Sequence, residues 1–136
     1  MRAFIAISIL IAVFSGCLRP EALKPFRTDG CSCFPDGTVK QRDLWRLCCI
    51  EHDRAYWMGG TAEERLAADR RLRECVADCG EPLIAELMLQ GVRAGGSPYL
   101  PTSFRWGFGW PYGRGYRALS DEERNTVRSM LEKKDQ

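Results

Sequence analysis

The sequence predicts a mainly α-helical domain that is stapled by disulfides, and two observations support this fold class. Apolar residues recur at helical spacing in several separate stretches, each bounded by a glycine, a proline or a capping residue. The chain also has 7 cysteines, most of which lie in or beside these stretches. Its 136 residues suit one domain once an N-terminal segment is set aside.

That N-terminal segment has the composition of an export signal. Arg2 precedes an apolar run over residues 3–14, which is shorter than the roughly 20 residues that a membrane-spanning helix needs. The run ends in Phe14-Ser15-Gly16-Cys17, which resembles the lipobox of bacterial lipoproteins. We therefore predict a signal peptide over residues 1–16 and a lipid anchor on Cys17, which would hold residues 17–136 in the cell envelope, facing the periplasm. A plain secreted protein and an uncleaved anchor are the alternatives.

Export would place the other cysteines in an oxidising compartment, where an even set indicates disulfides. These cysteines are Cys31, Cys33, Cys48, Cys49, Cys75 and Cys79. Spacing alone leaves their pairing open. A zinc site that uses Cys31, Cys33 and His52 is the rival interpretation, which the unfamiliar ligand spacing disfavours.

The formal net charge of +2 is close to balance, so it implies no polyanionic partner such as a nucleic acid. Arg70, Arg71 and Arg73 form the densest basic cluster. We interpret this cluster as the solvated face of a helix.

The first elements of the mature chain are predicted from its prolines and glycines. Residues 17–28 carry Pro20 and Pro25, which predict an extended tether, and the glycines, proline, aspartates and cysteines of residues 28–38 predict a rigid loop. A helix is then expected from about residue 41 to residue 58, because its apolar residues recur at near-helical spacing. Gly59 and Gly60 end it.

A second helix is expected to begin at Thr61, whose capping box with Glu64 marks a helix start, and to end at Gly80. The short glycine link makes these two helices antiparallel neighbours. Pro82 at a first-turn position predicts a third helix, which runs to about Val92.

The composition changes after the third helix. Residues 94–117 are rich in glycine, proline, arginine and aromatic side chains. Such a segment suits a membrane interface, but we expect it to fill the core of so small a domain. Ser120 and Glu123 then form another capping box, which begins a last amphipathic helix that ends before the polar tail at residue 133.

The first predicted helix carries His52, the chain's single histidine and the default group for proton transfer near neutral pH. Residues four apart share a helix face, so Cys48, His52 and Tyr56 lie on one face, while Cys49 and Asp53 lie on the next.

A disulfide from Cys49 to either Cys31 or Cys33 would hold the acidic loop beside Asp53. The carboxylate and the loop carbonyls would then supply the oxygen ligands that Ca²⁺ takes.

The rise of an α-helix predicts a second carboxylate beside the histidine. On antiparallel helices, a disulfide between Cys48 and Cys75 would leave Asp69 near His52, because the two displacements along the helices point the same way. Asp69 would then accept a hydrogen bond from one ring nitrogen and orient the other. Tyr56 is placed to bond the same carboxylate.

The pattern Cys48-Cys49-x-x-His52-Asp53-x-x-Tyr56, with Asp69-Arg70 and Cys75 further along, resembles the secreted phospholipase A2 family. That family carries Cys-Cys-x-x-His-Asp-x-Cys-Tyr and then Cys-Asp-Arg, with a cysteine six residues after the aspartate. The resemblance covers residues 31–75, roughly a third of the chain. It implies a helical fold whose antiparallel helix pair carries the active site, and calcium-dependent hydrolysis of the sn-2 acyl ester of glycerophospholipids at a membrane surface.

The resemblance also implies a role for each residue. His52 would activate water, Asp69 would orient His52, and Tyr56 would support Asp69. Asp53 would bind Ca²⁺ together with loop carbonyls, which are those of Ser32, Phe34 and Asp36. By elimination, Cys79 would pair with whichever of Cys31 and Cys33 is left.

The chain departs from the family pattern in two places. Ala55 and Ala68 replace two cysteines that bond to each other in the family, so that disulfide is absent as a unit. The family's glycine-rich loop is also altered, because Phe34 cannot take glycine-only conformations freely and Pro35 has no N–H group. This altered loop motivates an alternative, a non-catalytic lipid-binding envelope lipoprotein that keeps the scaffold. A structural lipoprotein that makes only protein contacts is a third hypothesis.

Overall fold

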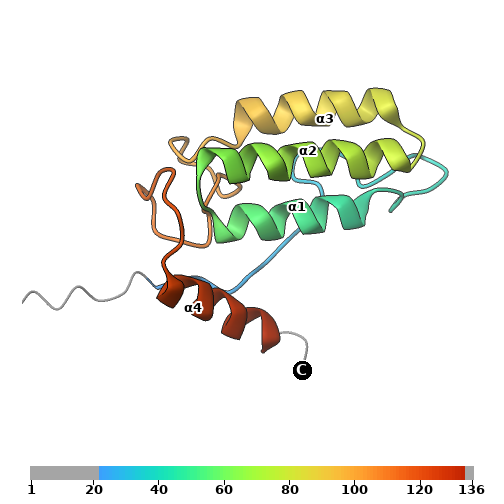
Figure 1. The fold of residues 1–136 in the computed structure, drawn as a ribbon. Coiled ribbons are helices and arrows are strands. Elements are labelled where there is room, and N and C mark those ends of the chain that lie inside the picture. Colours follow the sequence, from blue (N-terminus) through green and yellow to red (C-terminus); the bar gives the residue numbers. More distant parts are fainter. Residues whose placement is uncertain (1–21, 134–136) are drawn as a thin grey trace, which may run out of the picture.

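A computed structural model describes residues 22–133, and all the regular structure in this part of the chain is helical. The four helices are α1 (Arg46–Met58), α2 (Ala62–Asp78), α3 (Pro82–Gly95) and α4 (Asp121–Glu132) (Figure 1). The predicted all-α class is therefore confirmed. The predicted signal peptide and Cys17 lie outside the described residues. Within that range, no helix combines the length and the hydropathy needed to cross a bilayer.

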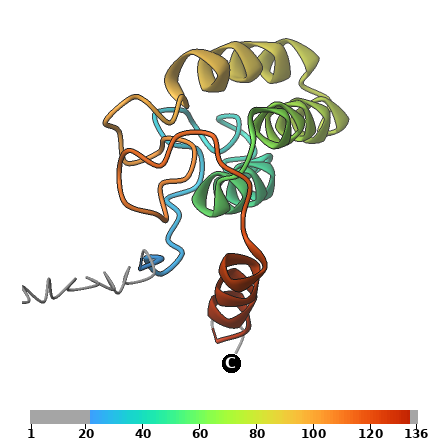
Figure 2. The ribbon, with the colours of Figure 1, turned by 60° about the vertical axis from the view of Figure 1, so that its left-hand side comes forward.

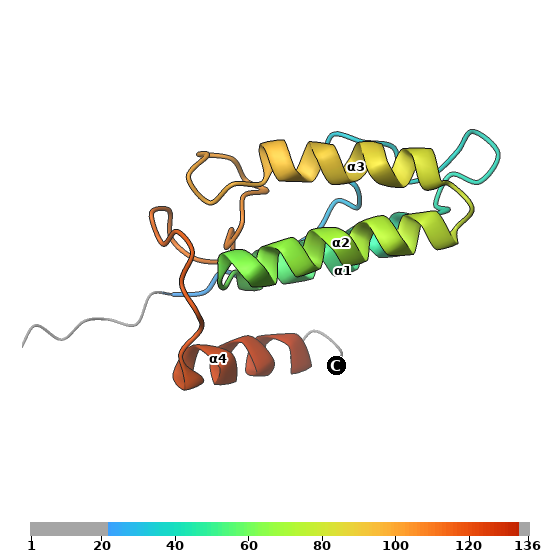
Figure 3. The ribbon, with the colours of Figure 1, turned by 45° about the horizontal axis from the view of Figure 1, so that its top comes forward.

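Three of the helices form one packed unit around α2. Helices α1 and α2 run antiparallel, and α3 runs back along α2 in the opposite direction (Figure 3). The link between α1 and α2 is short because Gly59 and Gly60 adopt positive φ angles of 70° and 137°, which side chains other than glycine rarely allow. Helix α4 lies apart from this unit (Figure 2).

The helix starts follow the capping signals closely where those signals exist. The capping boxes of Thr61 with Glu64 and of Ser120 with Glu123 are both formed, and they begin α2 and α4. Helix α1 instead begins at Arg46, later than predicted. The residues before it form separate turns, and the N–H of Trp45 donates to the carbonyl of Asp36 in the preceding loop at 3.0 Å.

Three hydrophobic clusters hold the described elements together, and the smallest has Tyr56, Ala68 and Trp106 as its buried members. The first lies among α1, α2 and α3, and its buried members are Trp45, Cys48, Cys49, Leu72, Val76, Ala85 and Met88. The second attaches α4 and residues 23–26 to the end of α1. Its buried members are Leu23, Phe26, Trp57, Trp110 and Val127.

The second cluster corrects the predicted tether. Residues 22–28 are extended, as expected, but Leu23 and Phe26 are buried. The backbone N–H of Lys24 donates to the carbonyl of Gly109 at 2.8 Å. This part of the predicted tether is therefore packed into the domain, because Leu23 and Phe26 belong to the same cluster as Trp57, Trp110 and Val127.

The aromatic segment fills the core, as predicted, through two of its residues. Trp106 and Trp110 are buried, whereas Tyr99 and Tyr112 are exposed. All four tryptophans in the sequence donate their indole N–H to a backbone carbonyl. The acceptors are Pro35 for Trp45, Lys24 for Trp57, Gly60 for Trp106 and Met58 for Trp110, at 2.7–2.9 Å.

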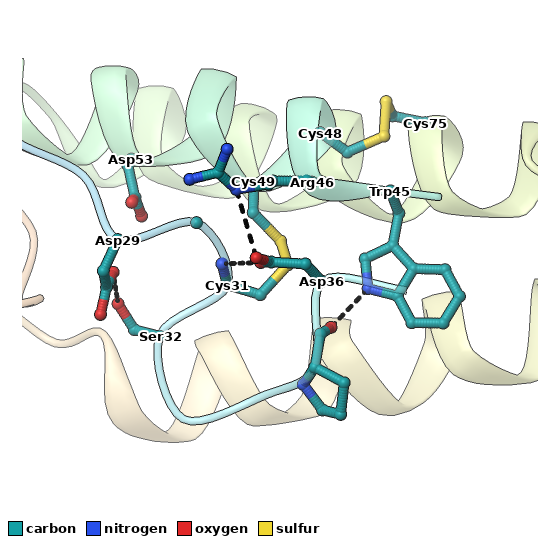
Figure 4. The surroundings of a disulfide bond; sticks show 12 residues. Asp29, Cys31, Ser32, Asp36, Trp45, Arg46, Cys48, Cys49, Asp53 and Cys75 are labelled. Atoms are coloured by element: carbon teal, nitrogen blue, oxygen red, sulfur yellow. Dashed lines mark hydrogen bonds and ion pairs between the residues drawn. A yellow bond between two sulfur atoms is a disulfide. The ribbon is translucent and has the colours of Figure 1, made fainter. Parts of the chain in front are cut away.

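Two disulfides lie where the helix argument expects them. Cys48–Cys75 joins α1 to α2, and Cys31–Cys49 joins the loop to α1 (Figure 4). Cys33 and Cys79 are free thiols, so the pairing predicted by elimination is wrong. The reason is that Cys79, at the end of α2, directs its thiol to the carbonyl of Leu44 at 3.4 Å, whereas Cys33 is exposed.

Candidate functional site

His52 and Asp69 meet between α1 and α2. The distance from His52 Nε2 to Asp69 Oδ1 is 2.8 Å. Both side chains are buried, and Asp69 has no exposed surface. The Cys48–Cys75 disulfide lies along the same pair of helix faces and holds the two helices at the register that brings the imidazole to the carboxylate.

Asp69 is the centre of a buried polar network. The hydroxyl of Tyr56 donates to Asp69 Oδ1 at 2.8 Å, and Arg93 donates to Oδ2 at 2.7 Å. Burial on its own would raise the pKa of Asp69, but the hydrogen bonds from His52, Arg93 and Tyr56 outweigh it and hold the pKa below its ordinary value. Asp69 is therefore ionised at neutral pH.

Arg65 closes this network and is missing from the sequence-based predictions. Its Nε donates to the Tyr56 hydroxyl at 3.0 Å and lies 3.8 Å from Asp69 Oδ2. Its Nη2 donates to the carbonyls of Val92 and Arg93, at the end of α3, at 2.8 and 3.0 Å, and its Nη1 donates to the Tyr116 hydroxyl at 2.6 Å. Arg65 precedes Asp69 by four residues on α2, and this spacing was the available sequence signal.

Arg93 is the second residue that the sequence analysis missed. It reaches Asp69 from the last turn of α3, and about a third of its side chain is exposed (37%). No local pattern in the sequence marks it, because its contact depends on how α3 packs on α2.

His52 also lines a cavity of about 410 Å³ between α1, α3 and the loop. The cavity wall is largely apolar and includes Phe34, Leu72, Leu87, Met88, Val92 and Phe104. Since Nε2 is bonded to Asp69, the nitrogen that is left for chemistry is Nδ1. No described residue hydrogen-bonds Nδ1, so the imidazole combines an anchored nitrogen with one that is free to bind a ligand.

Asp53 follows His52 on α1 and has a different environment. Its Oδ2 accepts a hydrogen bond from the Thr28 hydroxyl at 2.6 Å, and no described residue donates to its Oδ1. Burial raises the pKa of Asp53 to about 6, with smaller contributions from Asp29 and Asp36, while Thr28 and His52 act in the opposite direction. Asp53 is thus a partly buried carboxylate, and no cationic side chain among residues 22–133 forms an ion pair with it.

The loop brings two of its three predicted calcium ligands to Asp53. Ser32 and Phe34 line the same cavity as His52 and Asp53. Asp36, the third predicted ligand, does not line this cavity. Its carboxylate accepts from the Cys31 N–H at 2.7 Å and pairs with Arg46 at 3.2 Å (Figure 4). Its carbonyl accepts from the backbone N–H of Trp45 at 3.0 Å.

The rival zinc site is also absent from residues 22–133. Cys31 is bonded to Cys49, so it has no thiolate to offer a metal. In the same range, no group of three or more histidine, cysteine, aspartate or glutamate side chains is placed to hold a metal. A calcium ion beside Asp53 would therefore depend on backbone carbonyls for most of its ligands.

No family model, curated protein or solved structure matches the chain. The side chains around His52 and Asp53 are therefore the basis on which a function can be proposed.

Proposed function

We propose that the protein hydrolyses the sn-2 acyl ester of glycerophospholipids with the help of calcium. The single observation that carries the proposal is the anchored imidazole. His52 bonds Asp69 through Nε2 at 2.8 Å and lines an apolar cavity. A base held in this way beside an apolar wall suits an attack by water on an ester that is attached to an acyl chain.

In the proposed reaction, His52 Nδ1 takes a proton from the water that attacks the ester carbonyl. The imidazolium that results is stabilised by Asp69, whose pKa is held low and whose carboxylate stays ionised. Tyr56 and Arg93 donate to the same carboxylate and fix its position. His52 then returns the proton to the leaving alcohol.

The residues beside His52 fit a divalent cation in part. Asp53 offers a carboxylate oxygen to which no described residue donates, and burial raises its pKa to about 6. Asp53 and the carbonyls of Ser32 and Phe34 would hold the ion, and Asp36 would not. A bound Ca²⁺ would supply Lewis-acid stabilisation of the negative charge that develops on the ester oxygen.

The cavity favours a substrate with a long apolar group. Its wall contains side chains from α3 as well as Phe34 and Phe104, and it leads to the imidazole. A phospholipid offers an acyl chain for this wall and an ester at its end. The predicted lipid anchor at Cys17 would hold the enzyme close to such substrates.

The test is the release of labelled fatty acid from phospholipid labelled at the sn-2 position, with calcium and with a chelator. We expect His52→Ala to lose about 10²–10⁴-fold in turnover, which is the usual contribution of a general base. Glu74→Gln, an exposed change on α2, is the matched control and should keep full turnover. Unchanged turnover in His52→Ala would rule out the mechanism.

A second candidate function is lipid binding without catalysis, at the cell envelope. The position of Asp36 favours it, because one predicted calcium ligand faces Cys31, Trp45 and Arg46 instead of the cavity. Vesicle binding that persists in His52→Ala, with no lysophospholipid released by the unaltered protein, would select this alternative.

A further inference from the structure

A second cavity of about 840 Å³ lies on the other side of Asp53. Residues 24–29 form one wall and residues 101–112 contribute another. Ser32, Asp53 and Phe104 line both cavities, so the two spaces adjoin at the carboxylate that follows His52. A ligand that passes Asp53 could therefore occupy both.

The two cavities differ in charge. Lys24, Arg27 and Arg105 line the second cavity, whereas the described wall of the His52 cavity contains no lysine or arginine. Lys24 and Arg27 are exposed, and neither forms an ion pair with another residue in the range 22–133. Unpaired cations around a concave surface attract an anion.

Two other charged groups oppose these cations. Asp29 and Asp53 also line the second cavity, which leaves three cationic side chains against two carboxylates. The Asp29 carboxylate accepts a hydrogen bond from the Ser32 hydroxyl at 2.9 Å. Arg105 is buried, and its Nη2 donates a hydrogen bond to the carbonyl of Trp110 at 2.8 Å. Arg27 and Lys24 are therefore the two cations in this cavity with full freedom to reach a ligand.

We propose that the second cavity binds the anionic headgroup of the same phospholipid whose acyl chain enters the His52 cavity. The inference rests on the proposed function and adds a substrate class to it, namely phospholipids with net negative headgroups such as phosphoglycerol. The basis is the junction at Asp53, where an apolar space and a cationic space meet. An ester-linked lipid has the same order of parts, with an apolar chain, an ester and a charged phosphate.

The test measures binding of deacylated headgroups to the full chain, so it does not require turnover. The His52→Ala variant is titrated with glycerophosphoglycerol, with glycerophosphocholine and with inorganic phosphate, and binding is followed by backbone amide shifts in NMR spectra. We expect glycerophosphoglycerol to bind more tightly than the other two ligands. Arg27→Gln and Lys24→Gln should each weaken it about fivefold, which is the effect of one exposed charge contact.

The matched control is Arg42→Gln, which removes an exposed arginine that lines neither cavity. It should leave the affinity unchanged. An equal loss in Arg42→Gln, or equal binding of the two glycerophosphodiesters, would overturn the inference. Equal binding of inorganic phosphate would also overturn it and would assign the cavity to free phosphate.

A kinetic arm separates this inference from the proposed function. In the otherwise unaltered protein, Arg27→Gln should lower kcat/KM for short-chain phosphatidylglycerol several-fold relative to phosphatidylcholine. A protein that binds the anionic headgroup but releases no fatty acid contradicts only the hydrolysis proposal. A protein that hydrolyses both lipids equally, with or without Arg27, contradicts only the headgroup inference.

Discussion

His52 and Asp53 are neighbours on α1, yet their surroundings differ in how charge is neutralised. The His52 side has a buried network in which Asp69 is bonded by His52, Tyr56 and Arg93. The Asp53 side has one hydroxyl, from Thr28, and an oxygen without a donor. Three packed helices thus fix the imidazole of His52, whereas no described residue donates to Asp53 Oδ1.

The largest expected loss of stability comes from a variant that breaks the hydrogen-bond network on the His52 side. Asp69→Asn removes the buried charge that Arg65 and Arg93 face, so the free energy of unfolding should fall by about 4 kcal/mol, as for other broken buried pairs. Urea unfolding measures this loss. Glu74→Gln on the same helix is exposed and should change the value by less than about 0.5 kcal/mol. A similar loss in both variants would show that Asp69 has no special place in the fold.

The disulfide that sets the helix register should have the next largest effect. Cys48 and Cys75 are separated by 27 residues, and their joint replacement by alanine should cost about 3 kcal/mol of unfolding free energy. Replacing the free thiol in the loop, Cys33→Ser, should change it by less than about 0.5 kcal/mol because that side chain is exposed and unbonded. Thermal unfolding of the two variants in parallel compares the two sides of α1 directly. A large loss in Cys33→Ser would contradict the assigned pairing.

Removal of a single hydroxyl group from the network around Asp69 should have a smaller effect on stability. Tyr56→Phe takes away the hydroxyl that donates to Asp69 and accepts from Arg65. Burial raises the pKa of Tyr56, and Asp69 adds to this rise, so the hydroxyl is protonated at all working pH values. We expect a loss of about 1.5 kcal/mol in unfolding free energy. Turnover should fall less than in His52→Ala, and a greater fall would place Tyr56 closer to the reaction than proposed.

The smallest effect concerns Asp53 and has the opposite sign. Folding raises the pKa of Asp53 from 3.8 to about 6, so the folded protein binds more protons than the unfolded chain between these values. The ionised carboxylate therefore costs stability above about pH 6, and this cost disappears as the pH falls toward 4. In the presence of a chelator, Asp53→Asn should be about 1 kcal/mol more stable than the unaltered protein at pH 7.5, allowing for partial exposure.

The same pair of proteins at pH 4.5 should differ much less in stability. Asp69 does not confuse this comparison, because its pKa is lowered and its contribution is common to both proteins. A stability difference that stays constant from pH 7.5 to 4.5 would show that Asp53 is not held in its uncharged form by burial.

The His52 side could be predicted from the sequence because it depends on regular geometry. The rise and periodicity of two antiparallel helices, with a disulfide from Cys48 to Cys75, predict that Asp69 lies near His52. The contact of Arg93 with Asp69 was not predicted because Arg93 belongs to a third helix. The angle at which this helix packs cannot be derived from the spacing of residues in the sequence. Arg65 had the spacing, but its partners at the end of α3 depend on the same unknown packing.

The loop side could not be predicted because its shape is set by individual side-chain bonds. Asp36 satisfies the N–H of Cys31 and the guanidinium of Arg46, and such local bonds compete with any ligand role. The predicted pairing of Cys79 was wrong for a related reason. Elimination uses only the number of cysteines, and it does not take into account where each thiol points in the fold. The tether prediction failed for residues 22–28 because the apolar side chains on either side of Pro25, those of Leu23 and Phe26, are buried against the rest of the domain.

The indole bonds divide the four tryptophans between the two ends of α1. Trp45 bonds the carbonyl of Pro35 in the loop, whereas Trp57, Trp106 and Trp110 bond carbonyls near the other end of the helix. Intrinsic fluorescence therefore contains two spatially separate reporters. The difference between the emission of the unaltered chain and that of Trp45→Phe isolates the loop, so a spectroscopist can follow changes in the loop without attaching a dye.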